Sequence, residues 1–294
     1  MTTTAEWVSG ARPRTLPAAV SPVLIGSGAA AAEREFRWWA ALLALIVALA
    51  LQVAVNYAND YSDGIRGTDT NRVGPFRLVG SGAASPAAVK RAAFVAFGVA
   101  ALAGLVLVLA TQTYELLLVG AVCIAAAWFY TGGRRPYGYR GFGELSVFVF
   151  FGLVAVMGTT YVQTGRVTVA AVVGGIGCGA LACAILVVNN LRDIPTDSVT
   201  GKRTLAVVLG DQRTRTLYTV LVGTAFVAVF ALMFTVTAWA AVAFLSLPLA
   251  MGPLRAISSG RLGRELVPAL AGTGLLQLAY GALLGAGLAI SGVA

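Results

Sequence analysis

The sequence predicts an all-α membrane protein, a polytopic helical bundle of nine transmembrane helices that forms one domain over residues 1–294. Three observations predict this fold. Of the 294 residues, 58% are hydrophobic and only 11% are charged, whereas a soluble domain carries roughly a quarter charged residues. Apolar runs recur from Leu16 to Ile290 with no long polar stretch between them. Finally, 18 of the 21 Lys and Arg residues fall in alternate connections between these runs.

The nine predicted spans follow from the length of the apolar runs. A helix needs about 20 mainly apolar residues to cross a bilayer, and nine segments reach or approach this length. They cover approximately residues 16–32, 38–58, 91–110, 114–131, 143–162, 168–190, 216–235, 238–257 and 268–290. The N-terminus lacks the ordered basic region, apolar core and cleavage site of a secretory signal, so we expect the first span to be retained.

The basic residues predict an orientation. With nine spans, the N-terminus and the connections after even-numbered spans share one side, which leaves only Arg34, Arg37 and Arg166 on the other. Lys and Arg collect in cytoplasmic loops, so we expect a multi-pass protein of the plasma (inner) membrane with this side in the cytoplasm. The net charge of +9 is then explained without a nucleic-acid partner. The oligomeric state is not predicted.

Cysteine and histidine usage limits the available chemistry. Cys123, Cys178 and Cys183 lie inside apolar runs without C-x-x-C spacing, and the chain has no His. This pattern excludes a thiolate–histidine zinc site and a disulfide framework. Carboxylates, tyrosines and a bound metal are left to carry out any reaction.

A first polar cluster follows the second span, in NYANDYSDGIRGTDTNRVGPFRLVGSG. Asn56, Asp60 and Asp63 have i, i+4, i+7 spacing, so they share one face if the helix continues. Two carboxylates on one face repel each other unless a cation lies between them, and Mg²⁺ commonly binds between carboxylates and substrate phosphates. Arg72 and Arg77, just downstream, are suited to bind those phosphates.

A second cluster follows the sixth span, in NNLRDIPTDSVTGKRTLAVVLG. Asn189, Asp193 and Asp197 share a face and are followed by Lys202 and Arg203, so the order of residue types repeats that of the first cluster. Every Asp of the chain lies in or beside one of these two connections. Single polar residues at helix ends are often caps, but ionisable groups at membrane level are costly and mark functional sites. We therefore expect the two clusters to face one diphosphate.

These motifs resemble the UbiA superfamily of membrane prenyltransferases. The stretches ARPRTLP, NYANDYSDGIRGTD, RVGPFRLVGSG, YTGG, PYGYRGFGEL and NNLRDIPTD are similar to those of the branch that prenylates 1,4-dihydroxy-2-naphthoate for menaquinone synthesis. The resemblance implies a Mg²⁺-dependent enzyme that joins a polyprenyl diphosphate to dihydroxynaphthoate with decarboxylation, giving demethylmenaquinone. The family motif N-D-x-x-D-x-x-x-D maps onto Asn59, Asp60 and Asp63 as metal ligands, and the second cluster adds Asp193 and Asp197. Diphosphate binding is assigned to Asn56, Arg72, Arg77, Lys202 and Arg203 in these two clusters. Its last position is Gly67 here, which leaves Asp69 as a substitute.

The resemblance also implies roles for the connection between the fourth and fifth spans. Tyr130 and the following Arg134 or Arg135 would border the diphosphate and the reacting carbon. An aromatic face stabilises a cationic transition state, so Tyr130 joins Asp60, Asp63, Asp193 and Asp197 among the predicted catalytic residues. An interfacial position of Tyr130 is the alternative.

Four residues are assigned to the aromatic substrate: Arg12, Arg14, Glu144 and Asn189. The two arginines could equally be topology charges, and Glu144 could pair locally with Arg140. Arg213, Arg215, Arg255, Arg261 and Arg264 are expected to serve topology and lipid headgroups.

Two other functions remain open from the residues alone. Two similar polar helix ends also describe a secondary transporter, but transporter sites lie near mid-membrane and these aspartates lie at the ends of long apolar runs. An enzyme acting on hydroxybenzoate, homogentisate or haem is the second alternative, against which only the resemblance argues.

Overall fold

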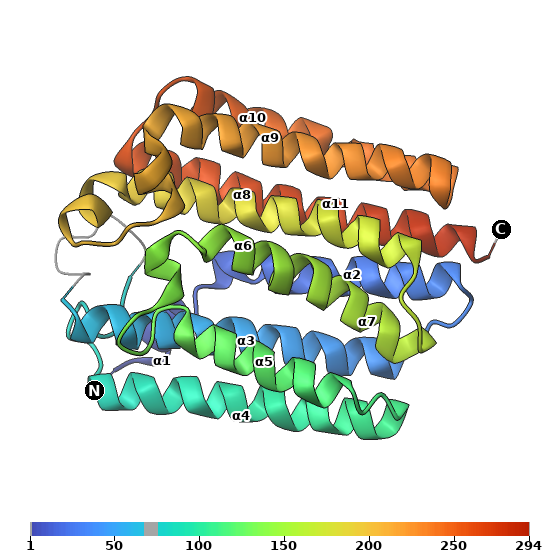
Figure 1. Cartoon of the computed structure of the whole chain (residues 1–294), viewed down its shortest axis with the longest axis horizontal. Helices are drawn as coiled ribbons and strands as arrows, with labels where there is room; N and C mark the ends of the chain where they lie inside the picture. The colour runs from blue at the N-terminus through green and yellow to red at the C-terminus, as the bar shows by residue number, and fades with distance from the viewer. Residues whose placement is uncertain (1, 68–75, 294) are drawn as a thin grey trace.

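The computed structural model describes residues 2–67 and 76–293, and the regular elements in these ranges are all helical (Figure 1). In chain order they are α1 (Thr4–Gly10), η1 (Pro13–Thr15), α2 (Pro17–Ala32), α3 (Trp38–Ile65), α4 (Pro86–Thr111), α5 (Leu116–Phe129), η2 (Tyr137–Arg140), α6 (Gly143–Val147), η3 (Phe148–Val154), α7 (Ala155–Thr164), α8 (Val169–Val199), α9 (Leu205–Thr235), η4 (Ala238–Ser246), α10 (Leu247–Ser258), η5 (Gly263–Leu266) and α11 (Val267–Ser291).

The helices correspond to the predicted spans. Within the described ranges, seven helical stretches are long and apolar enough to cross a membrane, and Thr4–Thr15 with Pro17–Ala32 forms an eighth as a pair bent by 50°. The remaining predicted segment is α5, whose 14 residues rise only about 21 Å, less than the ~30 Å hydrocarbon core. The all-α membrane fold is confirmed, while the count of nine spans holds only if the bent pair and the short α5 are included.

Two spans run further than the apolar pattern predicts. Helix α3 continues to Ile65 rather than 58, and α8 continues to Val199 rather than 190. The aspartates of both clusters therefore lie on helices. Asp60 and Asp193, for example, make hydrogen bonds to other groups of the protein. Helix α9 starts at Leu205 rather than 216. It breaks at Gly210, which has a φ of 76°, a left-handed conformation that favours glycine.

Small residues set the closest contacts between helices. A Cβ on Gly28 of α2 would lie 2.2 Å from the carbonyl oxygen of Gly285 in α11. A Cβ on Gly152 of η3, a π-helical stretch, would lie 2.5 Å from the Cα of Gly179 in α8. Small residues at such crossings let membrane helices approach until their backbones touch. These contacts fix α2 and η3 against the centre of the bundle.

The buried side chains form two main cores on opposite sides of the bundle. One joins α8, α9 and α11 with α2, and the other joins α3 and α4 with the turn around Leu78. Figure 1 shows α8 to α11 on one side, α3 to α5 on the other, and α2, α6 and α7 between them. The two long polar helix ends therefore belong to different packing units.

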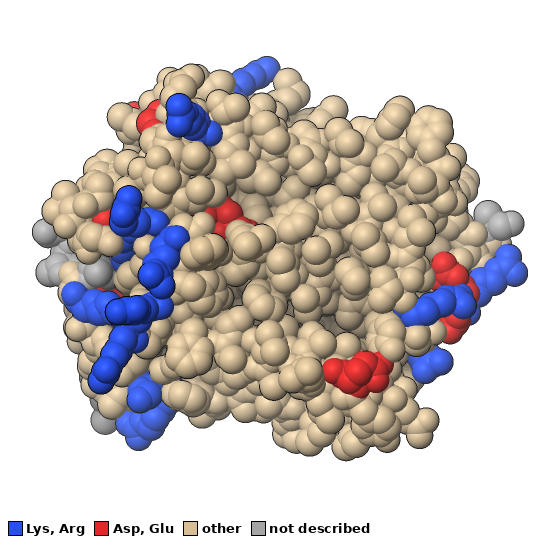
Figure 2. All heavy atoms as spheres, viewed as in Figure 1, with Lys and Arg blue, Asp and Glu red and all other residues tan. Residues whose placement is uncertain are grey.

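The charges divide the surface into two ends and an apolar belt (Figure 2). Lys and Arg gather at one end, which we call the basic end, and this end carries the polar termini of α3 and α8. At the other end, Arg166 pairs with Glu33 and Glu35 at 2.6 and 3.0 Å. The chain termini lie at opposite ends (Figure 1), as an odd number of crossings requires.

Candidate active site

A cavity of about 870 Å³ lies between α3, α5, η3 and α8. Its polar lining comes from the basic end and includes most of the predicted site residues. Its apolar lining includes Leu51 and Val55, which precede Asn59 and Asp63 on α3, together with Cys123, Phe150 and Phe151. The cavity can therefore hold a molecule with a charged head and an apolar tail.

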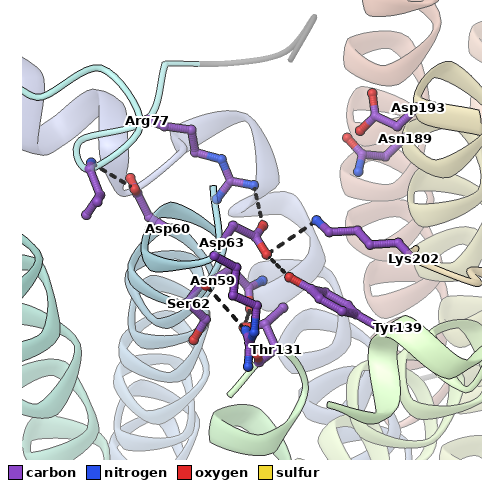
Figure 3. Close-up of polar contacts among 12 residues, drawn as sticks. Asn59, Asp60, Ser62, Asp63, Arg77, Thr131, Tyr139, Asn189, Asp193 and Lys202 are labelled. Atoms are coloured by element: carbon purple, nitrogen blue, oxygen red, sulfur yellow. Dashed lines mark hydrogen bonds and ion pairs between the residues drawn. The ribbon is translucent and has the colours of Figure 1, made fainter. Parts of the chain in front are cut away.

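Asp63 of α3 is the centre of the polar lining (Figure 3). The Tyr139 hydroxyl donates to Oδ1, and the Lys202 Nζ lies 3.3 Å from the same oxygen. Arg77 Nη2 lies 3.3 Å from Oδ2. All of these groups except Tyr139 are at least nine-tenths buried. A buried carboxylate is tolerable when cations compensate it, and here they come from two segments outside α3.

Tyr139 is a residue that the sequence did not single out. It lies within PYGYRGFGEL, where the sequence analysis assigned a role only to Glu144. In the structure Lys202 Nζ lies 4.6 Å from the Tyr139 ring centroid, a cation–π contact. Tyr139 thus orients both partners of the Asp63–Lys202 pair.

Asn59 and Asn56 line the cavity from the same helix. The Thr131 hydroxyl donates to Asn59 Oδ1 at 2.7 Å. Asn56 Nδ2 donates to the Ala11 carbonyl at 2.8 Å and to Thr15 Oγ1 at 3.0 Å. The Asn56 side chain therefore ties α3 to the N-terminal segment as well as facing the cavity.

Asp60 departs from the sequence expectation. Its side chain is fully buried and does not line the cavity. Its Oδ2 accepts a hydrogen bond from the Leu78 amide at 2.7 Å, and its Oδ1 accepts one from the Val79 amide at 3.0 Å. In this structure Asp60 therefore faces the Leu78–Val79 turn, whereas Asp63, three residues later, faces the cavity.

The end of α8 supplies the opposite wall. Asp193 accepts from its neighbour Arg192 through both carboxylate oxygens at 2.7 Å. Arg192 also donates to Asn189 Oδ1 at 2.7 Å. Asn189, Asp193 and Asp197 all line the cavity, as the repeated motif predicts.

Lys202 joins the two helix ends. Its backbone amide donates to the Asp197 carbonyl at 3.0 Å, which closes the turn after α8. From this turn its side chain reaches Asp63 on α3. The next residue, Arg203, has an exposed side chain in a separate surface hollow that it shares with Arg135 and Arg140. Arg203 therefore does not line the cavity, contrary to expectation.

The connection before α6 contributes one of its three predicted residues. Tyr130 lines the cavity with its ring 5.5 Å from that of Tyr137, edge to face. Arg134 and Arg135 are exposed and are not among the residues that line the cavity, so their binding of the diphosphate stays a prediction.

Of the four residues assigned to the aromatic substrate, three line the cavity and one does not. Arg12 and Arg14 line the cavity, and so does Arg264, which the sequence had left among the topology charges. Glu144 lies outside the lining, buried on α6, where its Oε1 accepts from Asn190 at 2.9 Å. In this structure Glu144 therefore faces Asn190 and does not reach the cavity.

The segment after α3 is only partly described. Gly67 has a φ of 70° just beyond the end of α3. This left-handed conformation suits glycine and ends the helix, which gives a physical reason for the missing family acid at this position. Arg72 and Asp69 lie outside the described residues.

The oxygen donors of the cavity fit a divided Mg²⁺ site. Within the described residues, no group of three or more His, Cys, Asp or Glu side chains converges on one point. Asp63 stands on one wall, and Asp193 on the other (Figure 3). Mg²⁺ prefers oxygen ligands and often takes one or two carboxylates together with substrate phosphates, so such a pair of walls can hold it once a phosphate completes the ligand set.

Relatives with known names match between about three quarters and nearly all of the chain. A 1,4-dihydroxy-2-naphthoate octaprenyltransferase from Mycobacterium tuberculosis is 57% identical over 280 residues, covering 95% of each chain. The protein of the same name from Mycobacterium leprae is 52% identical over 292 residues, covering 99% of each. That from Escherichia coli is 42% identical over 218 residues, covering 72% of this chain and 71% of the relative.

Solved structures share the fold at low identity. A UbiA homologue from Aeropyrum pernix K1 has a TM-score of 0.72 at 18% identity over 93% of this chain and 97% of that one. A UbiA homologue from Archaeoglobus fulgidus, bound to GPP and Mg²⁺, has a TM-score of 0.69 at 14% identity over 95% of this chain and 99% of that one. The sequence model of the UbiA prenyltransferase family matches residues 19–265. The chain belongs to the UbiA prenyltransferase family, as its paired aspartate motifs predict.

Proposed function

We propose that the protein transfers a polyprenyl group from polyprenyl diphosphate to 1,4-dihydroxy-2-naphthoate, releasing diphosphate and carbon dioxide. The observation that carries this proposal is one cavity with carboxylates and cations at its polar end and an apolar lining deeper in the bundle. The names of the mycobacterial relatives support the choice of acceptor. The aspartates lie at helix ends rather than at mid-membrane, which disfavours the transporter alternative.

The polar end would bind the diphosphate. Asn59, Asp63, Asp193 and Asp197 would hold Mg²⁺, which when bound would supply positive charge beside the diphosphate. Arg77 and Lys202 add fixed positive charge beside Asp63. Positive groups placed where negative charge develops lower the barrier to breaking the allylic C–O bond.

The acceptor would lie between Tyr130 and the arginines that line the cavity. The Tyr130 ring offers a π face to the positive allylic carbon, and Arg12 and Arg14 can bind the naphthoate carboxylate. The ring carbon that bears the carboxyl group forms the new C–C bond. The bond to the carboxyl group then breaks, its electron pair returns to the ring, and the product is demethylmenaquinone in its reduced form.

The orientation is part of the proposal. The protein is a multi-pass membrane protein, and we place its basic end in the cytoplasm because 18 of its 21 Lys and Arg residues lie on that side. Both water-soluble partners, dihydroxynaphthoate and Mg²⁺, would then reach the polar end directly.

A carboxyl label tests the reaction. Purified protein is incubated with Mg²⁺, polyprenyl diphosphate and dihydroxynaphthoate labelled in its carboxyl group, and labelled carbon dioxide and diphosphate are measured. We expect equal amounts of the two, because the ring regains aromaticity only when carbon dioxide leaves. Hydroxybenzoate, which is alkylated at a carbon bearing hydrogen and keeps its carboxylate, is the control acceptor.

Two outcomes would contradict the proposal in different ways. If the label stayed in the prenylated product, or if hydroxybenzoate were preferred, the acceptor would be wrong and the prenyltransferase chemistry would stand. If no acceptor released diphosphate, the enzyme assignment itself would fail.

A further inference from the structure

Asp60 holds a turn rather than facing the cavity. Both of its carboxylate oxygens accept hydrogen bonds from backbone amides, one from Leu78 at 2.7 Å and one from Val79 at 3.0 Å. In Figure 3 its carboxylate points toward this turn and away from the group around Asp63. Hydrogen bonds to a charged acceptor are shorter and stronger than neutral ones, so this pair fixes the turn against α3.

Two glycines complete the binding site for the turn. A Cβ on Gly64, one helical turn after Asp60, would lie 2.3 Å from Val79 Cγ1. A Cβ on Gly10 of α1 would lie 2.6 Å from Leu78 Cδ1. Leu78 itself is fully buried. We call Gly10, Asp60 and Gly64 the turn socket, because they bind the backbone and both side chains of Leu78 and Val79.

The turn socket sits directly beside a residue of the cavity. Arg77 precedes Leu78, is 7% exposed, and places Nη2 3.3 Å from Asp63 Oδ2. The turn is closed on itself, since the Ser81 hydroxyl and amide both donate to the Arg77 carbonyl, at 2.5 and 3.1 Å. A shift of Leu78 and Val79 would therefore move the Arg77 backbone and withdraw its guanidinium from the cavity wall.

We propose that Asp60 is a positioning residue, which seats Leu78 and Val79 in the turn socket and thereby holds Arg77 at the cavity, and that it is not a metal ligand. The two carboxylates of one helix end then have separate tasks: Asp63 faces the cavity, and Asp60 fixes the segment that delivers a cation to it. The part of the proposal that concerns diphosphate rests on the proposed function. The seating of the turn does not.

Two variants disturb the turn socket by independent routes. Asp60→Asn keeps one acceptor oxygen and sets an amide NH₂ against the other backbone N–H. Gly64→Ala leaves the Asp60 carboxylate intact and displaces Val79. Gly98→Ala in α4 is the matched control, because its added methyl meets no described atom within 4 Å. Asp63→Asn serves as the comparison for loss of a predicted metal ligand.

Hydrogen exchange and metal binding separate the two roles without any turnover. In metal-free protein, we expect Asp60→Asn and Gly64→Ala to speed amide exchange in the peptide that contains Leu78 and Val79 by about tenfold. Gly98→Ala and Asp63→Asn should leave this exchange unchanged. Mn²⁺ titrated in the presence of inorganic diphosphate and followed by EPR should bind Asp60→Asn in the wild-type number, whereas Asp63→Asn should lose bound ion.

Kinetics then connect the turn to the substrate. Both socket variants should raise KM for polyprenyl diphosphate by about tenfold and leave KM for the acceptor unchanged. If Asp60→Asn lost Mn²⁺ as Asp63→Asn does, with normal exchange at Leu78 and Val79, Asp60 would be a ligand and the proposal would be overturned. Wild-type exchange in Gly64→Ala would overturn it equally, even if Asp60→Asn failed to fold. A failure of dihydroxynaphthoate as acceptor would refute only the proposed function, because exchange and Mn²⁺ binding need no acceptor.

Discussion

The two polar helix ends have similar sequences but compensate their carboxylates differently. At the end of α8, Asp193 is paired with Arg192, the residue beside it. At the end of α3, Asp63 is paired with Arg77 and Lys202, which come from two other segments. Among the described ion pairs, that of Asp193 lies within α8, whereas those of Asp63 reach α3 from separate connections.

This difference shows which end depends on the rest of the fold. Helix α8 is central: 72% of the residues in its apolar 18-residue stretch are buried inside the protein. In the equivalent stretch of α3 only 22% are buried. The α3 end thus receives its cations from outside a less embedded helix, through the turn at Leu78 and the turn that carries Lys202. We expect perturbations of distant connections to affect Asp63 more than Asp193.

The largest effect should come from removing one carboxylate from either end. We expect Asp63→Asn and Asp193→Asn each to lower the rate of prenyl transfer by at least about 100-fold, the scale seen when a group that stabilises transition-state charge is lost. Single-turnover rates in detergent measure this, with gel filtration to show that the variants stay folded. Near-normal activity of either variant would mean that the two ends do not form one site.

The link between the ends should have the next largest effect. Lys202→Met removes the only described cation that joins the α8–α9 turn to Asp63, and we expect kcat/KM for the diphosphate to fall by about tenfold or more. Lys90 is the other lysine of the chain and has an exposed position on α4, so Lys90→Met is the matched control. Equal losses in the two variants would indicate a general effect of charge rather than a link.

The sequence predicted the fold class and the two ends but not the contacts within them. Apolar runs and the positions of Lys and Arg are local properties, and they identified the helices and placed both Asp clusters at one end of the bundle. The direction of Asp60 depends on the amides of Leu78 and Val79, which approach only in the folded protein. Spacing on a helix could not distinguish a carboxylate that faces the cavity from one that holds a turn.

The basic residues illustrate the same limit. Arg134 and Arg135 follow Tyr130 directly and look like phosphate ligands in the sequence, yet they are exposed. Arg264 looks like a topology charge and lines the cavity. Charge and position along the chain do not give the direction of a side chain in a connection.

The extent of the single domain over residues 1–294 remains a prediction.

A smaller effect should follow from Tyr139→Phe, which tests how much the hydrogen bond from the uncharged Tyr139 hydroxyl to Asp63 contributes to the α3 end. The variant removes one hydroxyl hydrogen bond from Asp63 and keeps the ring beneath Lys202. A hydrogen bond contributes about 1 kcal/mol net, so we expect kcat/KM to fall by about fivefold. Tyr137→Phe is the control, since the Tyr137 hydroxyl donates to the Ala126 carbonyl instead. A loss as large as that of Asp63→Asn would assign the Tyr139 hydroxyl a direct part in the reaction.

The smallest effect is expected from the exposed arginines beside the α8 end. Arg135 and Arg203 share a surface hollow outside the cavity, where water and salt screen their charges. Arg135→Gln and Arg203→Gln should therefore change kcat/KM for the diphosphate by about twofold or less, since exposed charges contribute little. Any such change should disappear at high salt, whereas the loss in Arg77→Gln should persist, because Arg77 is buried beside Asp63. A salt-independent increase in KM for Arg203→Gln would show that this hollow joins the diphosphate site when substrate binds, and that the α8 end also draws cations from outside its own helix.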